Sequence, residues 1–161
     1  MSLRLYFLRH GQAGNRHKWQ GDDSARPLTA RGRQRMKREA AAIRKMDLRL
    51  DLILTSPLAR AQQTAEIVAE TLGLGRRLVT EPRLAPGFGP RQLRPLLAKH
   101  RDVGALMLVG HEPDLSETIS HLIGGGRLDI KKGTLVLVEL ADRASPAGRL
   151  VWLIPPKALD R

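Results

Sequence analysis

The chain has 161 residues, 42% of them hydrophobic, and it carries 28 Lys and Arg against 16 Asp and Glu. This composition fits one globular domain with its own core and excludes a disordered chain. The longest apolar runs are too short to cross a bilayer, and residues 1–4 lack a signal peptide's apolar region, so we expect a soluble cytoplasmic protein without membrane contact. Cysteine is absent, which excludes disulfides, thiol catalysis and thiolate metal sites.

The formal net charge of +12 predicts attraction to anions. Aromatic residues make up only 3% of the chain, so stacking surfaces for single strands are scarce, and no nucleic-acid-binding motif is present. We therefore expect no specific nucleic-acid partner. A solvated basic surface is the simplest interpretation, and an anionic substrate or an acidic protein partner also fits.

Apolar periodicity and turn residues divide the chain into alternating strands and helices. Strands are expected at residues 3–8, 52–55, 78–80, 105–109, 134–140 and 149–154. Helices are expected at residues 29–46, 56–72, 92–100 and 115–122. Thr29 and Ser56 are the expected N-caps of the first two helices. Pro155 and Pro156 predict an exposed end.

This alternation predicts a mostly parallel sheet covered by helices on both faces. No internal repeat or linker divides the chain, so residues 1–161 are expected to form a single domain. Residues 11–28 form a long polar loop of turn-forming residues. A loop of this length beside a candidate site is more often functional than accidental.

Basic and imidazole side chains follow three of the predicted strands. Arg9 and His10 come directly after the first strand, Arg60 lies in the first turn of the helix after the second, and His111 follows the strand at 105–109. The carboxyl ends of parallel strands meet at one edge of a sheet, where ligands bind. Gly11 allows the chain to turn sharply there. The sequence thus predicts two guanidinium groups and two imidazoles in one site.

Cations gathered in this way require an anion, and guanidinium groups match the oxygens of phosphate. We therefore expect a phosphoryl site in which Arg9 and Arg60 supply the charge, with no cofactor or metal. His10 is the expected nucleophile, neutral because the cationic pocket lowers its pKa, with its second nitrogen held by a backbone acceptor. His111 would donate to the phosphoryl oxygens, and water would hydrolyse the phosphohistidine.

Three motifs resemble those of the histidine phosphatase (phosphoglycerate mutase-like) superfamily. They are Leu-Arg-His-Gly at residues 8–11, Ser-Pro-Leu-Ala-Arg-Ala-Gln-Gln-Thr-Ala at 56–65 and Val-Gly-His-Glu-Pro at 109–113. The Arg-Pro-Leu-Thr run at 26–29, the small size and the C-terminal pattern from Lys-Lys-Gly to Trp-Leu-Ile-Pro-Pro resemble its SixA-type phosphohistidine phosphatase branch. The resemblance implies a three-layer α/β/α sandwich, mostly parallel with one antiparallel strand.

By that resemblance His10 is the phosphorylated residue, and Arg9, Arg60 and His111 complete the phosphate pocket. Many relatives carry a mid-chain acid as proton donor. Glu81 is the candidate here, although it also fits a plain loop residue, and Gln12 flanks the first motif as a substrate-binding candidate. An imidazole leaves a phosphoramidate more easily than an alkoxide leaves a phosphoester, so the poor match at the acid favours phosphohistidine. The expected partner is a histidine phosphotransfer domain or a small phosphoester, and the protein is expected to be a monomer.

Several other functions fit parts of the sequence. A metal-dependent phosphoesterase would use ligands drawn from His10, His17, Asp22, Asp23 and His111, but their spacing matches no compact metal motif. The glycines at 124–126 lack the remainder of a phosphate-binding P-loop. A broad-specificity small-molecule phosphomonoesterase, a mutase and a non-catalytic phosphate-binding module remain the alternatives.

Overall fold

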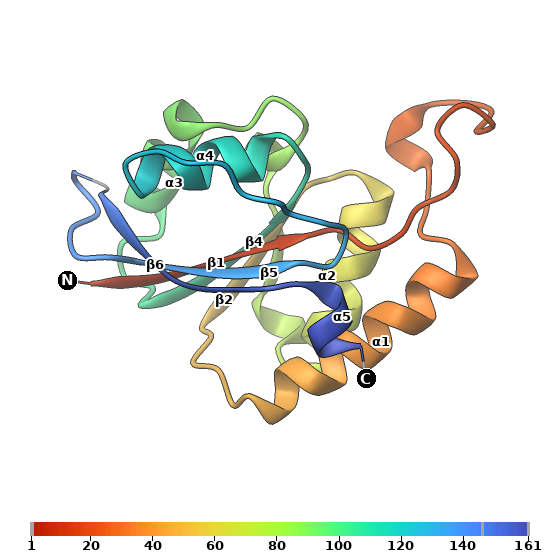
Figure 1. Ribbon diagram of the computed structural model, residues 1–161, viewed down its shortest axis with the longest axis horizontal. Coiled ribbons are helices and arrows are strands. Elements are labelled where there is room, and N and C mark those ends of the chain that lie inside the picture. The colour runs from red at the N-terminus through yellow and green to blue at the C-terminus, as the bar shows by residue number, and fades with distance from the viewer. Residues whose placement is uncertain (1, 146, 161) are drawn as a thin grey trace.

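A six-stranded sheet lies between two layers of helices in the computed structural model, which describes residues 2–145 and 147–160 (Figure 1). The strands are β1 (Leu3–Arg9), β2 (Leu52–Thr55), β3 (Leu78–Thr80), β4 (Ala105–Gly110), β5 (Leu135–Leu140) and β6 (Gly148–Ile154). The α-helices are α1 (Ala30–Lys45), α2 (Ala59–Leu72), α3 (Pro90–Lys99), α4 (Asp114–Leu122) and α5 (Pro156–Leu159). Short 3₁₀ turns lie at Asp23–Ala25, Gly75–Arg77 and Pro82–Leu84.

The strand order is β3-β2-β4-β1-β5-β6, and the first four strands are parallel. β5 runs antiparallel to both of its neighbours. This is the mostly parallel sheet with one reversed strand that the sequence predicts, and the predicted fold class is confirmed. The parallel register sets Arg9 opposite Gly110 and Thr55 opposite Val109, so the carboxyl ends of β1, β4 and β2 are level with one another.

Each face of the sheet has its own hydrophobic core, because side chains alternate between faces along a strand. In β1, Leu5 and Phe7 belong to the core under α3 and α4, whereas Tyr6 and Leu8 belong to the core under α1 and α2. Figure 1 shows these two helical layers on opposite sides of the sheet. β1 and β4 are apolar along most of their length because both of their faces are covered.

Of the two predicted helix N-caps, one agrees with the structure and one does not. Thr29 caps α1 as predicted, accepting a hydrogen bond from the Gly32 amide at 2.9 Å. Ser56, however, is not the N-cap of α2, which begins only at Ala59 after an extended Leu58. The three residues between β2 and α2 thus form a separate turn, and this leaves the Ser56 hydroxyl available to the site.

The exposed end predicted from Pro155 and Pro156 is correct for Pro155, which is exposed, and wrong for Pro156, which is buried. Pro156 begins α5, because a proline is well accommodated in the first turn of a helix. Pro156 and Leu159 are buried, and Asp160 pairs with Arg35 and Arg38 of α1. No helix of the described residues is long and apolar enough to span a membrane.

Candidate active site

A cleft of about 620 Å³ opens where β1 and β4 end, and we call it the main cleft. Its lining residues come from segments far apart in the sequence: Arg9, His10, Gln12, Ala13, Gly14, Asn15, Arg16, Asp23, Arg26, Thr29, Arg60, Pro86, His111, Glu112 and Lys132. Five of these side chains are Arg or Lys, and two are carboxylates. The structure therefore brings Arg9, His10, Gln12, Arg60 and His111 together.

His10 lies at the base of the main cleft and is only 6% exposed. Its backbone amide donates to the Gly110 carbonyl at 3.1 Å, and its Nδ1 is 2.7 Å from the Gly11 carbonyl. A carbonyl only accepts, so Nδ1 carries the ring proton and Nε2 holds a free electron pair. Burial, more than the charges of His111, Arg60 and Arg9, lowers the pKa of His10 to about 3. The sequence predicted a lowered pKa but assigned it to the cations.

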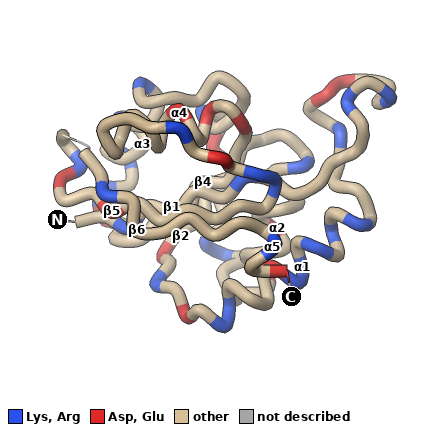
Figure 2. Tube along the Cα trace, viewed as in Figure 1, with Lys and Arg blue, Asp and Glu red and all other residues tan. Residues whose placement is uncertain are grey.

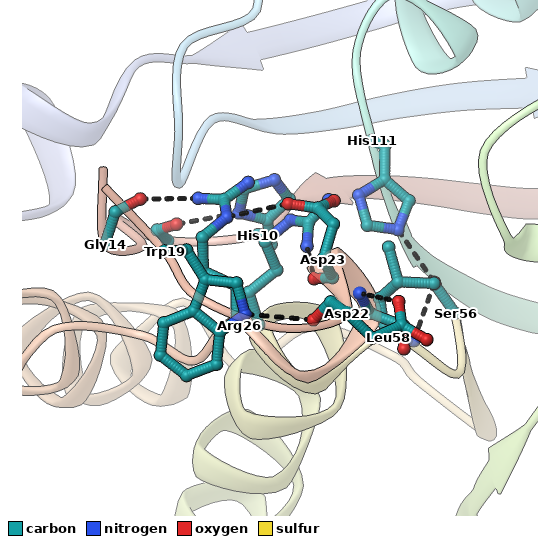
Figure 3. A network of polar contacts seen from close by, with 12 residues as sticks. His10, Gly14, Trp19, Asp22, Asp23, Arg26, Ser56, Leu58 and His111 are labelled. Carbon is teal, nitrogen blue, oxygen red and sulfur yellow. Dashed lines mark hydrogen bonds and ion pairs between the residues drawn. The ribbon is translucent and has the colours of Figure 1, made fainter. Parts of the chain in front are cut away.

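His111 faces His10 across the cleft, with the ring centroids 5.2 Å apart. Its Nε2 lies 2.7 Å from the Ser56 hydroxyl, which itself accepts from the Leu58 amide (Figure 3). Its Nδ1 is buried without a hydrogen-bond partner among the described residues. Burial, then Arg60 and Arg9, lowers the pKa of His111 to about 4. One edge of this ring is thus fixed by Ser56, and the other is free for a ligand.

The two predicted guanidinium groups are held in different ways. Arg9 donates from one terminal nitrogen to the Ile130 carbonyl at 2.9 Å. Arg60 is 6% exposed and donates to the backbone carbonyl and the carboxylate of Asp23, at 3.0 and 3.1 Å. The Nε of both residues is buried with no partner among the described residues. Each guanidinium group therefore has unused hydrogen-bonding capacity, and both residues line the main cleft.

The loop before α1 adds Asp23, which the sequence offered only as a metal ligand, and Arg26, which it named only as part of the 26–29 run. Arg26 is 7% exposed and donates to the Asp23 carboxylate at 2.9 Å and to the Gly14 carbonyl at 2.6 Å. Asp23 thus bridges Arg26 and Arg60, and its hydrogen bond from Arg26 is the main reason why its pKa is lowered. Figure 3 shows this network beside His10. The available signal was the Arg-Pro-Leu-Thr run at 26–29.

Glu81 is directed away from this cleft. Its carboxylate caps the 3₁₀ turn at Pro82–Leu84 by accepting from the Arg83 amide at 3.0 Å, and it lies 3.7 Å from the Lys99 amine. It does not line the main cleft. Gln12 does line it, and so does Glu112, one of whose oxygens accepts from the Ser116 amide.

Close packing fixes the turn that carries His10. The Gly11 amide donates to the Thr64 hydroxyl at 3.0 Å, and that hydroxyl donates to the Arg60 carbonyl at 2.8 Å. A Cβ on Gly32 of α1 would lie 2.1 Å from the Gln12 carbonyl oxygen, so only glycine allows α1 to approach this closely. α1 and α2 therefore hold the turn from both sides.

No group of three or more His, Asp or Glu side chains in residues 2–145 and 147–160 is arranged to hold a metal ion. Two of the candidate metal ligands make other contacts instead. Asp22 caps a 3₁₀ turn, and Asp23 accepts hydrogen bonds from arginines.

Comparisons with known proteins agree with this geometry. The model of the histidine phosphatase superfamily (branch 1) matches residues 5–89. An uncharacterized protein of Picosynechococcus is 38% identical over 143 residues, 83% of each chain. The phosphohistidine phosphatase SixA of Escherichia coli is 27% identical over 127 residues, 76% of each chain.

A solved structure of the protein histidine phosphatase SixA complexed with tungstate is similar in fold, with a TM-score of 0.86. It is 24% identical, and the match covers 98% of this chain and 99% of that one. The family predicted from the three motifs is confirmed: the chain belongs to the histidine phosphatase superfamily.

Proposed function

We propose that this member of the superfamily is a metal-independent phosphatase that removes phosphate from protein phosphohistidine through a covalent intermediate on His10. The observation that carries the proposal is the state of His10. It is buried and neutral, with Nδ1 donating to the Gly11 carbonyl and Nε2 left as a nucleophile beside Arg9 and Arg60. Tungstate, the ligand of the similar SixA structure, is also a tetrahedral oxyanion.

In the first step the phosphoryl oxygens occupy the space between the guanidinium groups of Arg9 and Arg60. The Nε2 of His10 attacks phosphorus, its bond to phosphorus forms, and the bond from phosphorus to the substrate's imidazole nitrogen breaks. That imidazole takes a proton from solvent as it leaves. His111, positioned by Ser56, donates from Nδ1 to a phosphoryl oxygen.

In the second step a water molecule attacks phosphorus and the bond to His10 breaks. Inorganic phosphate leaves with the protons of the water, and the electron pair returns to Nε2. The bond between Nδ1 and the Gly11 carbonyl holds the ring in one orientation through both steps, because this proton never has to move.

The contacts of Asp23 and of the predicted proton donor Glu81 favour phosphohistidine as the substrate. Asp23 is engaged by two arginines, and Glu81 caps a turn outside the cleft. An alkoxide leaving group needs a strong proton donor, whereas an imidazole becomes protonated near neutral pH and leaves readily. The engagement of Asp23 and Glu81 therefore favours a nitrogen leaving group.

A small phosphomonoester is the second candidate substrate, and Glu112 is the feature that favours it. Glu112 lines the main cleft, and a hydrogen bond is present to only one of its two carboxylate oxygens among the described residues. The cleft volume of about 620 Å³ also falls in the range of small-molecule sites.

The test uses a histidine phosphotransfer domain labelled with radioactive phosphate on its histidine. The wild-type protein is expected to release inorganic phosphate and to carry an acid-labile label at His10 during turnover. His10→Ala is expected to lose at least about 10³-fold in turnover, because no nucleophile remains. His17→Ala, which changes an exposed histidine of the same loop, is the matched control and should keep wild-type turnover.

Turnover by His10→Ala at the wild-type rate would overturn the covalent mechanism. Rapid hydrolysis of p-nitrophenyl phosphate without release from the labelled domain would overturn phosphohistidine as the substrate and leave the phosphomonoester candidate.

A further inference from the structure

A second cleft, of about 400 Å³, adjoins the main cleft, and we call it the side cleft. It lies against the first half of α1. Its lining residues are Gly11, Gln12, Arg31, Gly32, Arg35, Met36, Glu39 and Lys132. Gln12 and Lys132 also line the main cleft, so the two clefts share a wall. A chain bound with its phosphoryl group at His10 therefore has the side cleft directly beside it.

The side cleft is cationic at neutral pH. Arg31 and Lys132 are exposed, and neither pairs with an acid among the described residues, whereas Arg35 pairs with Asp160 at 3.3 Å. Glu39 is the acid that lines the cleft. It is 1% exposed, and burial raises its pKa to about 8, so it is mostly protonated at pH 7. The two free cations are thus not opposed by a charged carboxylate of the lining.

The face of α1 that carries Arg31 is distinct from the rest of its basic surface. Arg31 and Arg35 are four residues apart and therefore lie on one face of the helix, whereas Arg33 is about 200° around the axis from Arg31. Figure 2 shows basic positions recurring along α1. Arg31 and Arg35 line the side cleft, and Arg33 does not. One basic face of α1 thus lies beside the candidate active site, and another basic face of the same helix is exposed to solvent.

We infer that the side cleft binds an acidic segment of the phosphoprotein substrate, next to the phosphohistidine that enters the main cleft. The inference rests on the proposed function. Carboxylates of the partner would interact with Arg31 and Lys132, while the phosphoryl group is held by Arg9 and Arg60. Exposed charge pairs of this kind contribute mainly to the rate of association, which makes their effect strongly dependent on salt.

A protein partner fits this surface better than a nucleic acid. Single-stranded nucleic acids bind on aromatic stacking surfaces, but Tyr6, Phe7 and Phe88 are buried in the cores. Trp19 is exposed, but it lines neither cleft. Neither cleft has an aromatic residue in its lining. The side cleft therefore offers charge and hydrogen bonding, as a run of Asp or Glu side chains requires.

The test uses two phosphohistidine peptides of 12 residues that differ only in four flanking positions, which are Glu in one and Gln in the other. We expect the wild-type kcat/KM to be about 5- to 20-fold higher for the Glu peptide at low salt, almost entirely through KM. The ratio should fall toward one at high salt. Arg31→Glu should remove the preference for the Glu peptide.

Arg33→Glu is the matched control, because it makes the same charge change two residues along the same helix but outside the side cleft. It should keep most of the preference. Equal wild-type kcat/KM values for the two peptides would overturn the inference. An equal loss of the preference for the Glu peptide in Arg31→Glu and Arg33→Glu would also overturn it. Strong inhibition of peptide turnover by a 12-nucleotide single strand would also overturn the inference, if Arg31→Glu abolished that inhibition.

Failure of the proposed function is distinguishable from failure of this inference. Lack of turnover of both peptides, with p-nitrophenyl phosphate still hydrolysed, would contradict the proposed substrate. Turnover of both peptides at the same rate would contradict only the acidic docking site.

Discussion

The two ends of the central strands both carry arginines beside a cleft, but only one end has the properties of an active site. At the amino end, Arg49 and Arg77 line a cleft of about 430 Å³ together with Asp51 and Asp102. The charges there are balanced, and the side chain of Arg49 is 68% exposed beside Asp51 at 3.9 Å. Such pairs contribute little energy, because water screens them.

At the carboxyl end, the side chain of Arg60 is only 7% exposed, and cations outnumber carboxylates in the cleft lining. Arg60 and the neutral His10 line the same cleft. Positive charge alone therefore does not distinguish a candidate phosphate site in this basic protein. We propose that burial together with an excess of cations does.

The largest difference between the two ends should come from their arginines. Arg60→Ala is expected to reduce kcat/KM by about 10²- to 10³-fold, since it removes donors to the transferring phosphoryl group. Arg60→Lys should recover only part of this, because an amine lacks the paired N–H donors of a guanidinium group. Arg49→Ala, at the amino end, should stay within about twofold of wild type. Steady-state kinetics with p-nitrophenyl phosphate measures all three, and a similar loss in Arg49→Ala would contradict the comparison.

Packing beneath the site can be tested through Gly32. Gly32→Ala is expected to lower the free energy of unfolding by about 1 to 3 kcal/mol, because its Cβ would lie 2.1 Å from the Gln12 carbonyl oxygen. Activity should fall as well, since the displaced segment follows His10 and Gly11 directly. Gly75→Ala is the control, because nothing lies within 4 Å of its Cβ. Urea unfolding measures the stability of both variants. Equal stability of the two would show that α1 does not pack so closely against Gln12.

Glu39 should give the smallest effect, as a pH dependence of stability. Its pKa is raised from 4.5 to about 8. Between pH 4.5 and pH 8, the folded state therefore keeps a proton on Glu39 that the unfolded state has lost. Stability should therefore fall as pH rises through this range. Glu39→Gln should remove this slope and be more stable than wild type by about 1 to 2 kcal/mol at pH 8. Thermal unfolding from pH 5 to 8 measures it, with the exposed Glu66→Gln as control; parallel curves for wild type and Glu39→Gln would contradict the assignment.

The features that the sequence predicts well are local ones. The apolar run at 105–109 and the Thr29 cap depend on neighbouring residues, and both predictions agree with the structure. The convergence of Arg9, His10, Arg60 and His111 also follows from sequence order, because parallel strands place their carboxyl ends at one edge.

Contacts that depend on register or on the path of a loop were not predictable. The hydrogen bond between Ser56 and His111 joins residues 55 positions apart and exists because Thr55 pairs with Val109. Asp23 reaches Arg60 through a loop that has no periodicity to show where it runs. Glu81 follows β3 as expected, but its direction depends on a 3₁₀ turn that no pattern marks.

The state of His10 is the central claim, and ¹⁵N NMR of histidine-labelled protein tests it most directly. The signals of His10 are assigned by their loss in His10→Asn. With its pKa near 3, His10 should remain neutral at pH 5, with the proton on Nδ1 and Nε2 unprotonated. A His10 ring that is doubly protonated at pH 5, or that carries its single proton on Nε2, would contradict its role as the nucleophile.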